Sequence, residues 1–218
     1  MRFTFMALVL VYIGSASIAK AGGLEYGPRV ATSIPTHDVR EALGPGLRYG
    51  WTATFMDSPS RGSGFDISYC RWPGSSEIDR RLDQLFSALS GVPISGSKTT
   101  VSTVQVAVHR KLFALDKGPI LPWLKFGAGV ERVNSKLELP IGDLQDAGFR
   151  VTTSGPGDVS YRFGLQIGPG LDVRITANTK LGLDASYGVI FTEEPLITAF
   201  SISAFLLDAP RQAATGRR

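Results

Sequence analysis

Several segments of the chain alternate strictly between apolar and polar side chains. In residues 161–175 the odd positions are apolar or aromatic, and the even positions are glycine, glutamine or charged. Residues 180–191 alternate in the same way. Because successive side chains of a β-strand point to opposite faces, a period of two predicts strands. Each predicted strand therefore has one apolar face and one face of glycine and polar groups.

The same alternation predicts eight strands in all. They lie at 24–33, 47–55, 64–69, 103–114, 122–131, 161–175, 180–191 and 198–206. Tight connections alternate with longer ones, of which 73–99 and 134–158 are the longest. This alternation is typical of consecutive antiparallel strands with one plain end and one elaborated end. We therefore expect an all-β, up-and-down meander, with its tight turns periplasmic and its long loops outside if it spans a membrane.

One helix is predicted inside the longest loop, over residues 76–90. Its apolar residues recur at helical spacing: Ile78, Leu82, Leu85, Phe86 and Leu89. Ser76 and Asp79 have the spacing of a capping box, and Gly91 stands where a C-cap is expected. A short amphipathic helix at this place could cap the barrel mouth, lie on a membrane or contact a partner. The interpretation we favour is that it packs on its own barrel.

Period-two alternation does not by itself say which face meets water. A lipocalin-like soluble carrier turns its apolar face inward around a ligand, whereas a transmembrane barrel turns it outward to lipid. Glycines of the strands gather on the charged face: Gly127, Gly129, Gly164, Gly168, Gly170, Gly182 and Gly188. Inside a narrow eight-stranded barrel they would leave room for charged neighbours, which favours a polar interior. The fold class we expect is an eight-stranded antiparallel up-and-down transmembrane β-barrel with one short amphipathic helix in a long loop.

Aromatic side chains support the same orientation. Tyr and Trp gather at the headgroup level of bilayers, and many strands reach the length that a tilted strand needs to cross the hydrocarbon. A closed barrel also satisfies every backbone hydrogen bond, as lipid requires. The aromatics predicted to face lipid are Tyr26, Tyr49, Trp51, Phe55, Tyr69, Phe126, Tyr161, Phe163, Tyr187, Phe191 and Phe200.

The N-terminus has the form of a secretory signal peptide. Arg2 precedes an apolar run of Phe3 to Ile13, and small residues end in Ala19-Lys20-Ala21. The run is too short for a membrane-spanning helix, which needs about 20 residues; an uncleaved anchor is the alternative. We therefore expect a signal peptide at 1–21, a barrel at 22–207 and a short polar tail at 208–218.

Overall composition excludes some classes of function. The net charge of +4 is scattered along 218 residues, so no nucleic-acid footprint is indicated. The single cysteine, Cys70, cannot form an intramolecular disulfide. We expect no cofactor and no metal site, and a monomer.

The chain resembles the small outer-membrane β-barrels of Gram-negative bacteria, the OmpA-like and opacity-type porin group. The resemblance covers about Leu24 to Leu207 and is strongest in "PWLKFGAGVE" and in the hairpin "YRFGLQIGPGLDVRITANTKLGLDASYGVIF". It implies an outer-membrane location and export by the signal peptide. The C-terminus departs from the group, which commonly ends on an aromatic residue, because thirteen residues follow Phe205.

The polar faces carry charges of both signs. The acidic set expected inside the barrel is Glu25, Asp66, Glu131, Asp172 and Asp184, and the basic set is Arg29, Arg48, Lys111, Lys125, Arg162, Arg174 and Lys180. Interleaved signs indicate a salt-bridged plug rather than a channel of one sign, since unpaired buried charges are unfavourable. A narrow ion leak is the alternative.

Enzymatic chemistry has little support in the sequence. Barrels that resemble lipid A deacylases or palmitoyltransferases use a Ser/His pair, and only His37 and His109 are available. His37 lies in a predicted loop beside Asp38, with Ser33 the nearest serine, whereas His109 is expected inside the barrel as a structural residue. No G-x-S-x-G motif occurs. We expect no catalytic residues.

These observations lead to an expected role that is structural, adhesive or concerned with envelope integrity. The alternatives are a lipid-modifying barrel enzyme and a soluble lipocalin-like carrier of an apolar ligand. Expected partners are outer-membrane lipid and lipopolysaccharide, with an extracellular ligand of loops 73–99 and 134–158 as a further hypothesis.

Overall fold

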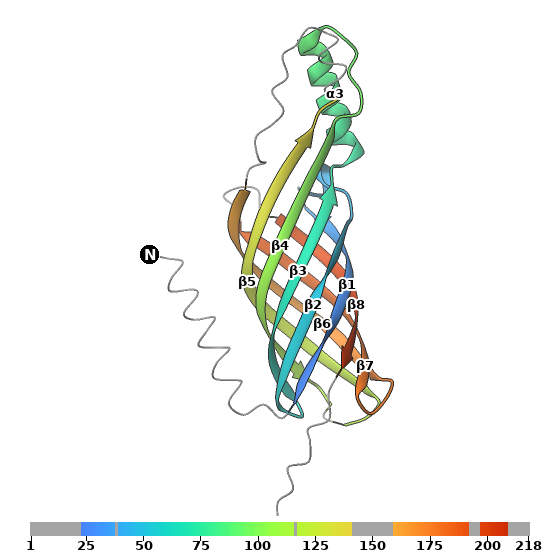
Figure 1. The fold of residues 1–218 in the computed structure, drawn as a ribbon, viewed down its shortest axis with the longest axis vertical. Helices are drawn as coiled ribbons and strands as arrows, with labels where there is room; N and C mark the ends of the chain where they lie inside the picture. Colours follow the sequence, from blue (N-terminus) through green and yellow to red (C-terminus); the bar gives the residue numbers. More distant parts are fainter. Residues whose placement is uncertain (1–22, 38, 116, 141–158, 192–196, 209–218) are drawn as a thin grey trace, which may run out of the picture.

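The strands close into one antiparallel barrel. The computed structural model describes residues 23–37, 39–115, 117–140, 159–191 and 197–208. Each strand pairs with the next in the chain, and the first pairs with the last (Figure 1). The strands are β1 Leu24–Thr36, β2 Gly46–Ser58, β3 Arg61–Pro73, β4 Lys98–Phe113, β5 Ile120–Glu138, β6 Val159–Arg174, β7 Thr179–Phe191 and β8 Ile197–Asp208. The predicted eight-stranded up-and-down barrel is confirmed.

Several strands are longer than the alternation predicted. β3 has 13 residues where 64–69 were expected, and β5 has 19. The ladder between β4 and β5 extends as far as the pair Lys98 and Glu138. These two strands therefore rise beyond the others at the end that carries α3, as Figure 1 shows. Pairing lengthens a strand even where its side chains no longer alternate.

Side chains alternate between a buried inner face and an exposed outer face. Along β1, Glu25, Arg29 and Ser33 are buried, while Tyr26 and Val30 between them are exposed. The polar face thus lies inside, and the apolar face forms the outer surface. A soluble carrier with an apolar lumen does not fit this arrangement.

Inward-facing glycines leave space for side chains of two kinds. A Cβ at Gly164 would lie 3.2 Å from a carboxylate oxygen of Glu131, as the sequence led us to expect. A Cβ at Gly182, in contrast, would overlap the ring of Phe205, and the same holds for Gly170 and an aromatic ring of β5. The lumen is therefore filled by aromatic rings as well as by charges.

Two helices lie at one end of the barrel. α3, Ser76–Ser90, has the predicted bounds and ends at Gly91, whose φ of 71° is left-handed. Its N-cap is Ser75 rather than Ser76, because the Ser75 hydroxyl accepts the Ile78 amide at 3.2 Å. The second helix, α2, Val39–Ala42, was not predicted, since one turn is too short to show a period.

The expectation that α3 packs on the barrel is wrong. None of its residues is buried, and it stands beyond the strand ends (Figure 1). Its base is joined to α2, because the Ser75 amide donates to the Ala42 carbonyl at 2.9 Å and the Ser75 hydroxyl to the carbonyl of Glu41. The barrel mouth is covered by α2 instead.

In the described part of the chain, neither helix has the length and apolarity needed to cross a bilayer. The predicted signal peptide lies outside the described residues, as does the tail from residue 209.

We expect Gly182→Ala to destabilise the barrel by about 1–3 kcal/mol, because the added methyl group overpacks a filled lumen. Gly188→Ala is the matched control on the same inner face of β7, since its Cβ would meet nothing closer than 3.7 Å. Urea unfolding in lipid vesicles measures both. Equal midpoints for the two variants would contradict this packing.

Candidate functional site: the closed lumen and the helical extension

Asp66 lies at the centre of the lumen and contacts basic side chains from three strands. Its carboxylate is 3.6 Å from Arg29 of β1, 3.3 Å from His109 of β4 and 3.4 Å from Lys125 of β5. Gln166 of β6 donates a further hydrogen bond at 3.2 Å. All five side chains are buried. One carboxylate therefore joins the inner faces of five strands.

Asp184 of β7 extends this network. Arg29 donates to both of its oxygens at 2.9 Å, and Lys125 lies 3.5 Å away. Ser203 of β8 binds both Arg29, at 2.6 Å, and Asp184. We call Arg29, Asp66, His109, Lys125 and Asp184 the central network. Buried charges of opposite sign pair with one another here, which offsets part of the cost of burying them in a lumen of low dielectric constant.

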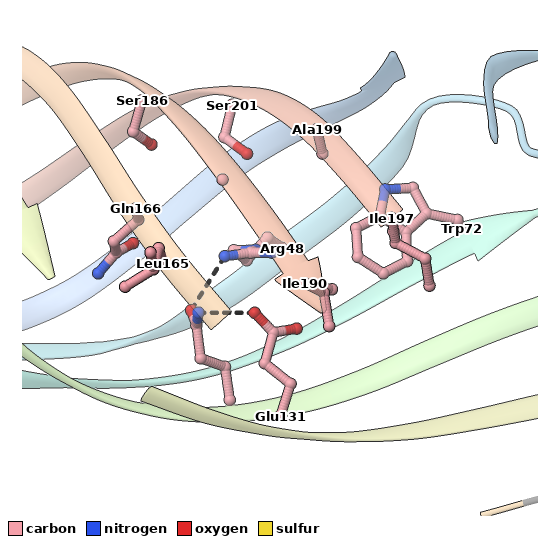
Figure 2. Close-up of a pocket in the computed structure, with 12 residues that line it drawn as sticks. Arg48, Trp72, Glu131, Leu165, Gln166, Ser186, Ile190, Ile197, Ala199 and Ser201 are labelled. Atoms are coloured by element: carbon pink, nitrogen blue, oxygen red, sulfur yellow. Dashed lines mark hydrogen bonds between the residues drawn. The ribbon is translucent and has the colours of Figure 1, made fainter. Parts of the chain in front are cut away.

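A second polar group lies nearer the helical end. Arg48 donates to Gln105 at 3.0 Å, and Gln105 donates to Glu131 at 2.7 Å. Figure 2 shows Arg48 and Glu131 pointing toward each other, joined by the dashed lines through the side chain between them. The cavity they line has a volume of about 20 Å³. That volume holds about one water molecule.

Lys111 lies at the opposite end of the lumen in an aromatic cage. Its Nζ is 4.3 Å from the ring centroid of Trp123, 5.0 Å from Phe205 and 5.9 Å from Phe113. Asp172 is 3.6 Å from the same ammonium and accepts the Trp123 indole N–H at 2.7 Å. A desolvated cation–π contact contributes about 2 kcal/mol.

An apolar cluster closes each end of the lumen. The cluster at the helical end consists of Val39, Leu43, Cys70, Trp72, Val133, Ile190 and Ala199. The cluster at the turn end consists of Phe113, Leu121, Trp123, Phe205 and Leu207. The sequence pattern did not reveal either cluster, because their members are isolated apolar residues on polar faces or, like Val39 and Leu43, lie in a connection.

Most of the charges that the sequence assigned to the interior are buried. Glu25 and Lys180 form an ion pair beside the turn-end cluster. Arg48 and Arg162 are half-buried. The prediction that Arg174 lies inside the barrel is wrong. Arg174 is on the same face of β6 as the buried Asp172, but it is exposed because β6 ends there and the lumen no longer surrounds it.

The eleven predicted aromatics all lie on the outer face, and none is buried. Those exposed are Tyr26, Tyr49, Trp51, Phe126, Tyr161, Phe191 and Phe200, and those half-buried are Phe55, Tyr69, Phe163 and Tyr187. Two pairs of rings contact each other, Tyr49 with Tyr69 at 5.2 Å and Phe163 with Phe191 at 5.8 Å.

One ion pair lies on the outer face near the β2–β3 turn. Arg110 is 2.9 Å from Asp57 and donates to Ser63 at 2.5 Å. The sequence already indicated an unusual position here, because Arg110 is the one charged residue on the otherwise apolar face of the predicted strand 103–114. A carboxylate of β2, two strands away, thus neutralises this arginine across β3.

The two histidines have different surroundings. His37 is exposed, has a φ of 55°, and its Nδ1 lies 3.3 Å from the hydroxyls of Thr36 and Thr198. It has no hydrogen bond to Ser33, which binds Ser201 in the lumen, and Asp38 lies outside the described residues.

His109 joins a hydroxyl to a carboxylate. Its Nε2 is 3.0 Å from the Thr54 hydroxyl, and its Nδ1 is 3.3 Å from Asp66. These are the residue types of a nucleophilic triad, yet Thr54 is completely buried. Within the described ranges no three His, Cys, Asp or Glu side chains are placed to hold a metal ion.

Beyond the lumen, α3 is held by the segment that returns from it, residues 91–97, which we call the strap. Three side chains one turn apart accept strap or β4 amides: Asp79 from Thr99 at 3.0 Å, Asp83 from Ser97 at 2.9 Å and Ser87 from Ile94 at 2.7 Å. Hydrogen bonds from Ser97 hold the pKa of Asp83 below its usual range. The helix and strap form one ordered unit, the helical extension (residues 75–99).

The outer tip of the helical extension is apolar. Leu85 is 53% exposed and Leu89 70% exposed, and Val92 lies beside them in the chain. Arg80 and Arg81 are both exposed and share the carboxylate of Glu77. The extension therefore presents exposed leucines on a helix whose charges are largely paired.

Two solved structures resemble the chain closely enough to identify its fold. Neisserial surface protein A has 13% sequence identity over 86% of this chain and 97% of its own, with a TM-score of 0.52. A major outer membrane protein of Thermus thermophilus has 8% identity over 85% and 99%, with a TM-score of 0.53. No protein-family model matches the sequence, and neither does any curated protein. The fold is that of a transmembrane β-barrel.

Removing the central carboxylate tests the network. We expect Asp66→Asn to destabilise the barrel by about 3–5 kcal/mol, because the buried Arg29 and Lys125 then have to share the one carboxylate of Asp184. Glu77→Gln on α3 is the control, since its ion pairs are exposed and contribute little. The measurement is the urea midpoint of folding into lipid vesicles, and an unchanged midpoint for Asp66→Asn would refute the network's role.

Proposed function

We propose that this chain is a non-conducting barrel of the Gram-negative outer membrane that holds the helical extension outside the cell for structural or adhesive contacts. The observation that carries the proposal is the closed lumen. The central network occupies its middle, an apolar cluster closes each end, and the cavity at Arg48 has room for about one water molecule.

The proposed orientation follows from the connections. The strand ends that are joined by the short β2–β3, β4–β5 and β6–β7 connections lie at one end of the barrel, and α2 and α3 lie at the other. Outer-membrane barrels have short periplasmic turns and longer extracellular loops. The helical extension is therefore assigned to the outside, and the eleven outward aromatics to the lipid.

An adhesive role has support in the helical extension itself. Long surface loops are usually mobile. Here the hydrogen bonds between α3 and residues 94–99 hold the loop in one arrangement. Leu85 and Leu89 remain exposed at its tip, where a partner surface could cover them. We assign contact with a ligand to this tip and anchorage to the barrel.

We assign a structural role to Thr54, His109 and Asp66. A nucleophilic hydroxyl must reach the carbonyl of its substrate, whereas the Thr54 hydroxyl lies inside the lumen beside the central network.

We also assign the chain to the OmpA-like and opacity-type barrels, because the hairpin of β6 and β7 is rich in glycine as in that group.

Planar-bilayer recording tests the closed lumen. We expect the refolded barrel to insert without discrete conductance steps. A double variant, Trp123→Ala/Phe205→Ala, opens the turn-end cluster and its cage around Lys111, and we expect it to conduct, which shows that insertion is detected. Steps from the wild-type barrel would refute the proposal, and a silent double variant would refute the assignment of the seal.

Cysteine labelling of intact cells tests the orientation. The native Cys70 is buried and gives no background. A membrane-impermeant maleimide should label Ala88→Cys on α3 but not Lys117→Cys in the β4–β5 turn, since both positions are exposed but lie at opposite ends. Lysed cells provide the control in which both variants react. Labelling of Lys117→Cys alone in intact cells would show that the barrel has the opposite orientation to the one proposed.

A further inference from the structure

The outward face of β5 shows where the apolar surface ends. Its outward residues are apolar from Ile120 to Val130, and Arg132 is the next. Ten residue steps of about 3.3 Å, tilted by about 40°, rise about 25 Å. That is the height of the apolar band of a transmembrane barrel, so Arg132 lies at its boundary.

A second arginine occupies the same boundary two strands away. On β3 the outward residues Phe65, Ile67 and Tyr69 are followed by Arg71. The register places Arg71 opposite Ser102 of β4, and Arg132 opposite the adjacent outward residue of β4, Val104. Two strand spacings across the sheet and two residues along β4 therefore place the two arginines about 12 Å apart. Both are exposed.

Neither arginine forms an ion pair with a carboxylate of the described part of the chain, although Glu138 interacts electrostatically with Arg71 at longer range. No described carboxylate lies within 4 Å of Arg71 or Arg132. Farther from the apolar rows, Lys136 binds Glu138 at 2.7 Å, and Lys98 pairs with Glu138 in the ladder. The outward surface of β3–β5 at this end thus carries four basic groups and one acidic group, namely Arg71, Lys98, Arg132, Lys136 and Glu138. At the other end, the outward Arg110 is neutralised by Asp57.

Aromatic residues and an apolar row adjoin these arginines. Tyr69, Val104, Arg132 and Tyr161 lie side by side in one row, and the next row toward the turn end is Ile67, Val106, Val130 and Phe163. Tyrosines at a headgroup level and an unbroken apolar row below them suit a lipid with its acyl chains on the barrel wall.

We propose that this surface binds the phosphorylated headgroup of the glycolipid of the outer leaflet, with Arg71 and Arg132 on its phosphates and its acyl chains along Ile67, Val106 and Phe163. Arginine binds phosphate through two parallel hydrogen bonds. The assignment to the outer leaflet rests on the proposed orientation, in which this end faces outside. The other exposed arginines of the strands, Arg61 and Arg174, lie at the turn end.

The test is a titration of the refolded barrel in zwitterionic micelles with bis-phosphorylated lipid A, followed by native mass spectrometry. We expect Arg71→Gln/Arg132→Gln to lose affinity at least about tenfold, because the charged hydrogen bonds from both guanidinium groups to the phosphates are removed. The matched control, Arg61→Gln/Arg174→Gln, removes the same charge from the turn end and should change affinity less than twofold. Heat-dependent migration in electrophoresis confirms that both variants are folded.

Two comparison lipids define the ligand. We expect weaker binding of lipid A without its phosphates and of phosphatidylglycerol. An unchanged affinity in Arg71→Gln/Arg132→Gln, an equal loss in the control, or equal binding of phosphatidylglycerol would each overturn the site. The micelle measurement depends on neither orientation nor conductance, so its failure leaves the proposed function standing, and failure of the proposed function is seen in the labelling and bilayer experiments.

Discussion

Pairing of β1 with β8 is the interaction on which the rest of this structure depends. It leaves no strand edge open, which hydrocarbon would not tolerate. Closure with eight strands also fixes a narrow lumen that only side chains can fill. The inner faces must then supply the side chains that fill the lumen, which here are the paired charges of the central network and the two apolar clusters.

The lumen is organised in layers along the barrel axis. Apolar clusters lie at the ends, charges lie in the middle, and Lys111 joins the two kinds of layer because it contacts both Asp172 and the aromatic rings. Glycines opposite Trp123 and Phe205 allow these rings to enter. Because most charges inside the lumen pair with one another, the surfaces that we propose for ligands lie on the outside of the barrel and on the helical extension.

The two outer regions differ in how they are ordered. Arg71 and Arg132 stand on strands whose ladders fix their spacing, whereas Leu85 and Leu89 are held by a helix that depends on its strap. A surface on strands suits a lipid of constant structure in the surrounding leaflet. A helix on a loop is easier to vary, as surface segments generally are.

The sequence by itself determined the strands, their number and which side chains share a face, because a period of two depends only on local geometry. It also determined helix 76–90, since fifteen residues show a helical period, but not α2, which has four. Only the tertiary structure decided which charges meet. Asp66 contacts groups 37 residues before it and 100 residues after it, and register across strands sets those pairs. Arg174 is a second example. The sequence placed it on the inner face of its strand, but only the structure shows that the lumen ends before this residue.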